Sequence, residues 1–316
     1  MSIKNIIVGI LFVLGFSSLQ AQQVPQYTQY LFNHFGINPA VAGSKDCIDA
    51  RLGYRTQWVG FEGAPRTAFA NAHGQIKSKK KHLKNKHGIG VMVESDATGP
   101  TSRTNVYAAY AYHLPVTRKY MMSFGVFAGF QQYRVDAGAM TLTDFNDPAI
   151  QESSGAFIYP DVTPGIWLYS ENQYIGLSAR HILMNDIPNL GMESNLVHHY
   201  SLIGGRKIEL KNSSNNISII PSFNLRFAPM APLGLDLNVM ADFNNRFMAG
   251  LSYRNVDAIA ALVQVRFLEY FTLGYAFDFT TSRIRTASSN THEVILGIYS
   301  CPSRGGGGSY ICPAYQ

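Results

Sequence analysis

The sequence predicts an all-β fold, a transmembrane outer-membrane β-barrel of about 14 antiparallel strands preceded by an N-terminal periplasmic segment. Segments of about ten residues alternate between apolar and polar side chains along most of the chain, as membrane-spanning strands do. Charged residues make up 15% of the chain, compared with about a quarter in an average soluble domain. Aromatic residues make up 12%, which argues against a disordered chain.

The first 21 residues are predicted to be a secretory signal peptide. Lys4 supplies a positive charge, an apolar run covers 6–16, and the small residue Ala21 suits cleavage. A membrane-anchoring helix is the alternative, but it needs about 20 apolar residues. The predicted organisation is a signal peptide at 1–21, an N-terminal periplasmic segment at 22–46, a barrel at 47–300 and a glycine-rich tail with two Cys-Pro pairs at 301–316.

The first predicted strand, 48–58, shows the alternation most clearly. Ile48, Leu52 and Tyr54 fall on one face, whereas Asp49 and Arg51 fall on the other. A charged inner face would destabilise the core of a β-sandwich. It suits a barrel with lipid outside and a polar lumen inside, so this segment favours a membrane barrel.

Further segments extend the pattern to the end of the chain. Seven more alternate clearly: 105–114, 120–131, 217–227, 235–241, 246–254, 271–280 and 293–298. Six alternate more weakly: 65–77, 88–95, 163–170, 173–183, 199–209 and 257–267. Pro221 lies within one strand and removes a donor from the hydrogen-bond ladder, so we expect a β-bulge there.

The lengths of the connections predict the orientation of the barrel. Short connections at 115–119, 171–173, 242–245 and 268–269 fall on the periplasmic side. Long connections at 134–161 and 184–198 fall on the outer side. One basic connection, 77–87, is placed in the periplasm, where it either meets an acidic partner or is simply a solvated loop.

The N-terminal segment shows no strand alternation and has too many aromatic residues for a disordered tail. We expect it to pack against or plug the periplasmic mouth of the barrel. Irregular exposed segments often carry recognition, so we predict that the long outer connections and the two terminal segments take part in partner binding, and the basic connection is a further candidate. The candidate residues are Tyr27, Tyr30, Asn38, Pro39, Lys79, Lys80 and Lys81.

Three cysteines follow the signal peptide: Cys47, Cys301 and Cys312. An exported protein meets an oxidising compartment, so a disulfide is expected. Cys47 begins the first predicted strand and Cys301 ends the last, and these two strands pair when a barrel closes. The sequence leaves two bridges open, Cys47–Cys301 and Cys301–Cys312. The distance between the Cα atoms determines which of them can form, and the sequence does not give that distance.

The sequence predicts neither an enzyme nor a cofactor or metal site. Ser178 and His181 are three residues apart, so they fall on opposite faces of a strand and cannot form a catalytic pair. The carboxylates and arginines of the lumen are expected to pair with each other: Asp49, Glu94, Asp236, Asp278 and Glu293 with Arg51, Arg55, Arg226, Arg254 and Arg266. The lysine run has no aromatic interleaving, which argues against nucleic acid. Four aromatic residues are assigned to the membrane interface: Trp58, Tyr112, Tyr120 and Trp167.

Several motifs resemble those of one known family. Tyr27-Thr28-Gln29-Tyr30 and Ile37-Asn38-Pro39-Ala40 resemble the N-terminal signature of the PorP/SprF family. Tyr54-Arg55-Thr56-Gln57-Trp58 resembles its next block, and Gly274-Tyr275-Ala276-Phe277-Asp278 resembles a later one. The resemblance implies an outer-membrane accessory barrel of the type IX secretion system, with the lipid bilayer and periplasmic components of that system as partners.

The resemblance implies two roles within the family. A SprF-like member would bind and anchor, or help to export, a large cell-surface adhesin through its C-terminal domain, in support of gliding motility. A PorP-like member would link the outer membrane to periplasmic motor or peptidoglycan-binding components. A diffusion channel is a further alternative, and it would require an open lumen. Arginine–carboxylate pairs and the N-terminal segment argue against an open lumen.

Overall fold

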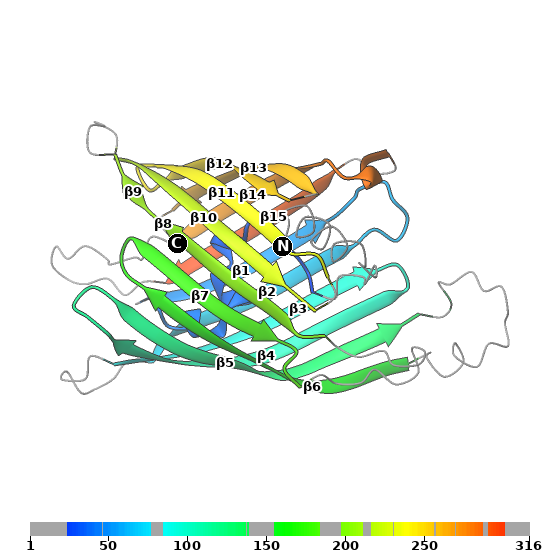
Figure 1. Cartoon of the computed structure of the whole chain (residues 1–316), viewed down its shortest axis with the longest axis horizontal. Helices are drawn as coiled ribbons and strands as arrows, with labels where there is room; N and C mark the ends of the chain where they lie inside the picture. Colours follow the sequence, from blue (N-terminus) through cyan, green and yellow to red (C-terminus); the bar gives the residue numbers. More distant parts are fainter. Residues whose placement is uncertain are drawn as a thin grey trace, which may run out of the picture.

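The computed structural model describes residues 24–45, 47–76, 85–136, 138, 155–183, 197–210, 216–229, 231–255, 257–268, 270–286 and 290–300. Over these ranges the chain forms a closed antiparallel β-barrel (Figure 1). The predicted signal peptide at 1–21 and the tail at 301–316, with Cys301 and Cys312, lie outside the described residues, as do Lys79, Lys80 and Lys81.

Each strand pairs with its neighbour in the sequence, and the last strand closes on the first. The strands are β1 (Ile48–Thr56), β2 (Arg66–Ile76), β3 (Lys86–Thr98), β4 (Thr101–Pro115), β5 (Met121–Val135), β6 (Gly155–Tyr169), β7 (Gln173–Arg180), β8 (His199–Arg206), β9 (Ile208–Glu209), β10 (Ile217–Phe227), β11 (Gly234–Phe243), β12 (Phe247–Arg254), β13 (Ala258–Phe267), β14 (Phe271–Thr280) and β15 (Thr291–Ser300). Because β8 and β9 both pair with β10, they are two parts of one wall strand. The described residues therefore form 14 wall strands, and the predicted fold class is confirmed.

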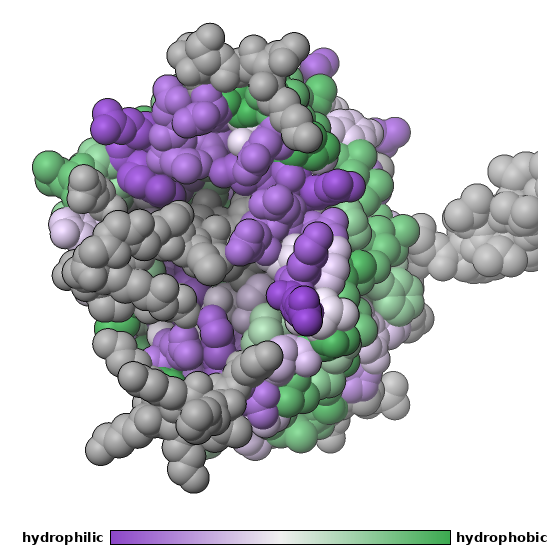
Figure 2. All heavy atoms as spheres, turned by 90° about the vertical axis from the view of Figure 1, so that its left-hand side faces the viewer, coloured by the Kyte–Doolittle hydropathy of each residue, from purple (hydrophilic) through white to green (hydrophobic). Residues whose placement is uncertain are grey.

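The two faces of each strand meet different surroundings. In β1, Ile48 and Leu52 are 58% and 51% exposed on the outer surface, whereas Asp49, Arg51 and Arg55 are buried in the lumen. Figure 2 looks onto one end of the barrel, where hydrophilic residues ring the mouth and the visible outer wall is mainly hydrophobic. No helix among the described residues is long and apolar enough to cross a membrane.

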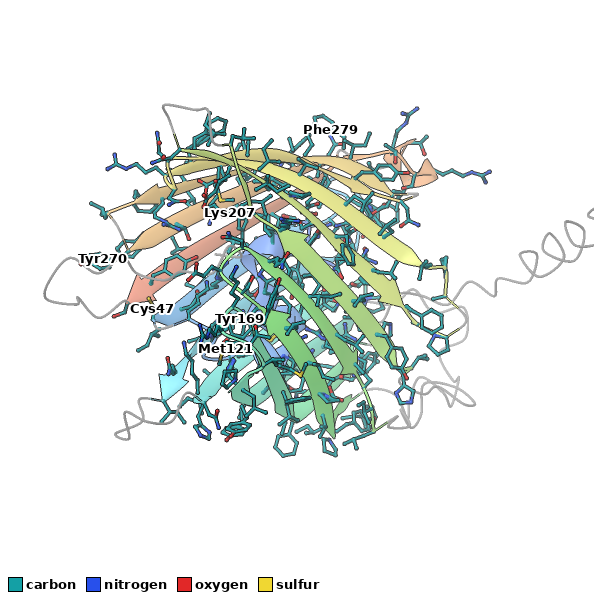
Figure 3. All side chains as sticks on the ribbon, turned by 60° about the vertical axis from the view of Figure 1, so that its left-hand side comes forward. Cys47, Met121, Tyr169, Lys207, Tyr270 and Phe279 are labelled. Atoms are coloured by element: carbon teal, nitrogen blue, oxygen red, sulfur yellow. The ribbon has the colours of Figure 1, made fainter. Side chains whose placement is uncertain are left out.

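The ends of the strands form two rims, one at each end of the barrel. One rim holds the start of β1, the end of β15 and the short turns β4–β5, β6–β7, β11–β12 and β13–β14. Figure 3 shows Cys47 and Tyr270 at this end of the barrel and Phe279 at the other. The long connection predicted at 134–161 is shorter than expected, because β5 continues to Val135 and β6 begins at Gly155.

The structure accommodates Pro221 without the predicted bulge. Gly205 pairs with Ser222 and Ile208 pairs with Ile219, so both sides of the break keep the same register and no extra residue is inserted. The pairing of β10 with the β8–β9 strand is interrupted opposite Ile220 and Pro221. On the β11 side of β10, Pro221 still pairs with Val239. Proline lacks an N–H group, so β10 makes one ladder hydrogen bond fewer at this position. The neighbouring strand has a short gap here instead of the predicted bulge.

Candidate functional site

The N-terminal segment lies inside the barrel, where it forms what we call the luminal plug, residues 24–45 (Figure 1). The plug contains three short helical turns: η1 (Tyr30–Phe32), α2 (His34–Ile37) and η2 (Pro39–Val41). Asn33 and Asn38 initiate two of these turns, because their side chains accept hydrogen bonds from the backbone N–H groups of Gly36 and Ala40. All residues of the three turns are buried.

Glu293 of β15 holds the backbone of the plug. Its carboxylate accepts hydrogen bonds from two consecutive backbone N–H groups, those of Thr28 at 2.8 Å and Gln29 at 3.0 Å. The side-chain amide of Gln29 donates in turn to the main-chain carbonyl of Glu293 at 3.0 Å. One wall residue thus satisfies three donors of the plug at a point where water is excluded.

A charged anchor surrounds Thr28; it consists of Arg55, Arg254, Asp278 and Glu293. Arg55 forms ion pairs with Glu293 at 2.9 Å and with Asp278 at 3.0 Å. The Thr28 hydroxyl donates to Asp278 at 2.7 Å and accepts from Arg55 at 2.6 Å and Arg254 at 3.1 Å. Two guanidinium groups and two carboxylates therefore balance in charge and meet at one plug residue, whose hydroxyl and backbone N–H offset much of their desolvation.

A second polar contact is made by Tyr27, the residue before Thr28. The hydroxyl of Tyr27 donates to Glu94 of β3, which also accepts from Arg180 at 3.3 Å and Asn105 at 3.0 Å. Arg180 additionally donates to the carbonyl of Gly36 in the plug. Burial and the adjacent Glu94 carboxylate hold the pKa of the Tyr27 phenol well above its ordinary value, so Tyr27 remains a hydrogen-bond donor.

Asn38 connects the plug to the wall at β6 and β7. Its side-chain amide donates to the backbone carbonyls of Ile166 at 3.0 Å and Leu177 at 3.1 Å. Gly165 leaves the room for this contact, because a Cβ atom there would lie 2.1 Å from the Asn38 side-chain oxygen. Ser178 donates to the carbonyl of Ile37 at 2.9 Å and extends the same contact.

Aromatic side chains fill the space between the plug and the wall. The His34 ring lies 3.0 Å from the Tyr174 hydroxyl, and the Tyr174 ring stacks on Trp167 with centroids 4.9 Å apart. The assignment of Trp167 to the membrane interface is therefore wrong, because this side chain is fully buried and faces the lumen. On the neighbouring strand β5, the Phe35 ring packs against Phe127 with centroids 5.1 Å apart.

The end of the plug is attached to the start of the barrel. Lys45 forms an ion pair with Asp49 at 2.5 Å, and Asp49 also pairs with Arg51 at 3.0 Å. The carbonyl of Ala42 accepts a hydrogen bond from His113 at 2.7 Å. The plug is therefore held along its whole length, from Tyr27 to Lys45, by side chains of the wall.

The structure places the predicted partner-binding residues Tyr27, Tyr30, Asn38 and Pro39 inside the barrel, where all four are buried. While the plug is docked, they contact the wall and are closed to other proteins. Cys47 is buried directly before β1, and both other cysteines lie outside the described residues.

Most of the predicted luminal ion pairs are present. Arg226 pairs with Asp236 at 3.1 Å, and Arg254 pairs with Asp236 at 3.0 Å. Arg266 has no carboxylate partner among the described residues and lies over the Tyr299 ring instead. Arg180 was missed by the sequence reasoning, although its position in an alternating strand was the signal that could have placed it in the lumen.

The arrangement is suited to holding the plug rather than to chemistry on a ligand. Apart from Arg266, the charged luminal side chains described above bond to one another or to the plug. Within the described ranges, no group of three or more His, Cys, Asp or Glu side chains is placed to hold a metal ion. The main feature of the lumen is therefore that the N-terminal segment of the chain itself occupies it.

The comparison with known families decides the identity of the chain. The sequence profile of the type IX secretion system membrane protein family PorP/SprF matches residues 19–298. The chain belongs to the PorP/SprF family. This PorP/SprF member is accordingly a β-barrel of the outer membrane associated with type IX secretion. No curated protein matches it in sequence.

Solved structures resemble this PorP/SprF member in fold. A FadL homologue from Pseudomonas aeruginosa is 10% identical, with a TM-score of 0.53, and the match covers 88% of this chain and 95% of that one. A mutant of TodX, a monoaromatic hydrocarbon channel, is 12% identical, with a TM-score of 0.51 and the same two coverages. At these identities the likeness shows the outer-membrane barrel fold alone.

Proposed function

We propose that this PorP/SprF protein is a closed, non-enzymatic accessory barrel that binds a large exported adhesin, through its C-terminal domain, and anchors it or assists its export. The single observation that supports a binding role over a pore is the docked plug, held by the charged anchor and by Glu94. A barrel filled in this way offers its rims, rather than its lumen, to another protein.

The outer rim favours the adhesin as the partner. The two longest connections between described strands, 136–154 and 181–198, both lie at the rim opposite the start of β1. Long connections on the outer side are typical of barrels that carry recognition at the cell surface. A link to gliding motility belongs to this proposal, because the resemblance to the family implies that role for its SprF-like members.

A PorP-like link to periplasmic motor or peptidoglycan-binding components is the second candidate. The lysine run 79–81 favours it, because its connection joins β2 and β3 at the rim that holds the short turns. A basic connection at the periplasmic rim would attract an acidic partner by electrostatic steering.

The experiment is a comparison of two loop variants in the native host. One variant replaces 139–150 by a short Gly-Ser linker, and the matched control replaces 78–83 in the same way. After mild detergent extraction and capture of the tagged barrel, bound proteins are identified by mass spectrometry. We expect the first variant alone to lose a large adhesin. Loss of a periplasmic component from the second variant alone would support the PorP-like role, and recovery of an unaccompanied wild-type barrel would contradict both.

A further inference from the structure

A groove opens on the outer surface of the barrel, beside the break between β8 and β9. It has a volume of about 690 Å³. Ile175, Gly204, Phe223 and Leu237 line it and form one continuous cross-strand row over β7, β8, β10 and β11. Ile175 and Leu237 are 45% and 46% exposed, so this row faces outward. The Phe223 ring lies over Gly204, because a Cβ atom at this glycine would come 2.7 Å from a ring carbon of Phe223.

One end of the groove is polar and lies at the rim of short turns. Gln173 pairs with Arg206 there, and the Gln173 amide donates to the hydroxyl of Tyr120. Arg206 is exposed and has no ion-pair partner among the described residues, whereas its neighbour Lys207 pairs with Asp242 at 3.0 Å. Figure 3 shows Lys207, Tyr169 and Met121 near this end of the barrel.

We propose that this groove binds one phospholipid of the periplasmic leaflet, with its phosphate at Arg206 and one acyl chain along the row that includes Gly204. The outward face of a membrane barrel meets hydrocarbon, so the occupant of the apolar part is an acyl chain. The cationic end requires an anionic group, and a guanidinium fork matches the geometry of phosphate. Short turns lie on the periplasmic side of such barrels, which places Arg206 at the headgroups of that leaflet.

The two parts of the groove suit one molecule because they are joined. Arg206 and Gly204 are two residues apart on β8, so both lie on the outward face. Tyr120 and Gln173 add a hydroxyl and an amide beside the guanidinium. Tyrosine at this depth is typical of the membrane interface, where one end of the side chain is wet.

The test is native mass spectrometry of the full-length barrel, delipidated in detergent and titrated with phosphatidylglycerol. We expect one retained lipid and an affinity at least about fivefold lower for Arg206→Ser, because a charge-assisted hydrogen bond is lost. Arg246→Ser, which removes an exposed arginine from the β11–β12 turn of the same rim, should bind as the wild type does. Equal binding by Arg206→Ser and the wild type would overturn the proposal.

A second pair of variants tests the apolar part. Leu237→Trp should fill the groove and weaken phosphatidylglycerol binding, whereas Leu251→Trp, on the outward face of β12, should not. Diacylglycerol with the same chains separates the phosphate from the acyl chains and should bind more weakly. Lipid A tests the other source of phosphate and acyl chains. Tighter binding of lipid A, or equal losses in Leu237→Trp and Leu251→Trp, would refute a periplasmic phospholipid site.

Discussion

Thr28 shows how a neutral side chain can organise a buried ionic cluster. Its hydroxyl accepts from Arg55 and Arg254 and donates to Asp278, while its backbone N–H binds Glu293. If the plug left, the two arginines and two carboxylates would lose this shared partner and would have to be solvated by water. Thr28 therefore links the docking of the plug to the hydrogen bonding of the charged side chains in the wall.

Replacing Glu293 tests this coupling at the residue scale. Glu293→Gln removes the charge that Arg55 faces and leaves one oxygen to serve two plug N–H groups. We expect the plug to open at least about tenfold more often, since breaking a buried ion pair costs more than 1.4 kcal/mol. Chymotrypsin cleavage of 24–45 in detergent, mapped by mass spectrometry, measures the opening.

Asp257→Asn is the matched control for that substitution. It also removes one negative charge, and Asp257 lies 3.4 Å from Arg254 of the charged anchor. Its side chain is 34% exposed, so water replaces much of the lost interaction and cleavage should stay at the wild-type rate. Equal protection of the plug in all three proteins would contradict the role assigned to Glu293.

At the scale of elements, the strands admit the plug because several luminal positions are glycine. Gly88, Gly125 and Gly165 lie on the inner faces of β3, β5 and β6. A Cβ atom at Gly125 would lie 2.4 Å from the backbone nitrogen of Ala40, and one at Gly88 would lie 1.9 Å from the carbonyl oxygen of Ala42. The backbone of η2 therefore packs directly on the backbone of the wall.

Gly125→Val should displace η2 while leaving the barrel folded. The new side chain would overlap plug backbone, which cannot move aside as the end of a long side chain can. We expect faster chymotrypsin cleavage of the plug with an unchanged β-sheet circular dichroism spectrum. Ala128→Val is the control, because Ala128 lies on the exposed outer face of the same strand. Equal cleavage of Gly125→Val and wild type would show that the wall yields instead.

Alternation in the sequence predicted the strands and the charged luminal face, but not the contacts between the plug and the wall. Charged residues such as Asp49 and Arg55 identified the inner face of β1 in the sequence. In β6 both faces are largely apolar or aromatic near Ile166 and Trp167, so periodicity could not assign Trp167 to the lumen. The contact of Thr28 with Asp278 joins residues 250 positions apart, and a local pattern contains no signal for such a pair.

For the whole molecule, closure depends on the pairing of the first and last strands. β1 pairs with β15 from Ile48 opposite Ser300 to Thr56 opposite His292. Cys47 directly precedes Ile48 and Cys301 directly follows Ser300 in sequence, and these two residues pair with each other, so both cysteines adjoin the same end of the seam. We predict that peptide mapping of the unreduced protein will find a Cys47–Cys301 disulfide, and that Cys47→Ser will lower the free energy of unfolding by about 2–4 kcal/mol. A Cys301–Cys312 bridge with a free Cys47 would contradict this prediction.

Removal of the whole plug tests whether the wall or the plug closes the lumen. The barrel ladder is complete without residues 24–45, so a variant that lacks them should still fold. Its luminal wall would expose Asp49, Arg55, Glu94 and Glu293, whose charges favour water over collapse. We expect stepwise conductance in planar bilayers from this variant and none from the full-length protein.

A synthetic peptide of residues 24–45 provides the control, because it carries every contact that the plug makes with the wall. Added to the plugless barrel, it should reduce the conductance, and a peptide with Thr28→Val and Asn38→Ala should not, since it lacks the contacts to Asp278 and to the carbonyl of Ile166. If the barrel without the plug is folded but does not conduct, the wall itself closes the lumen. A narrow wall, rather than the docked plug, would then be what favours a binding role over a pore.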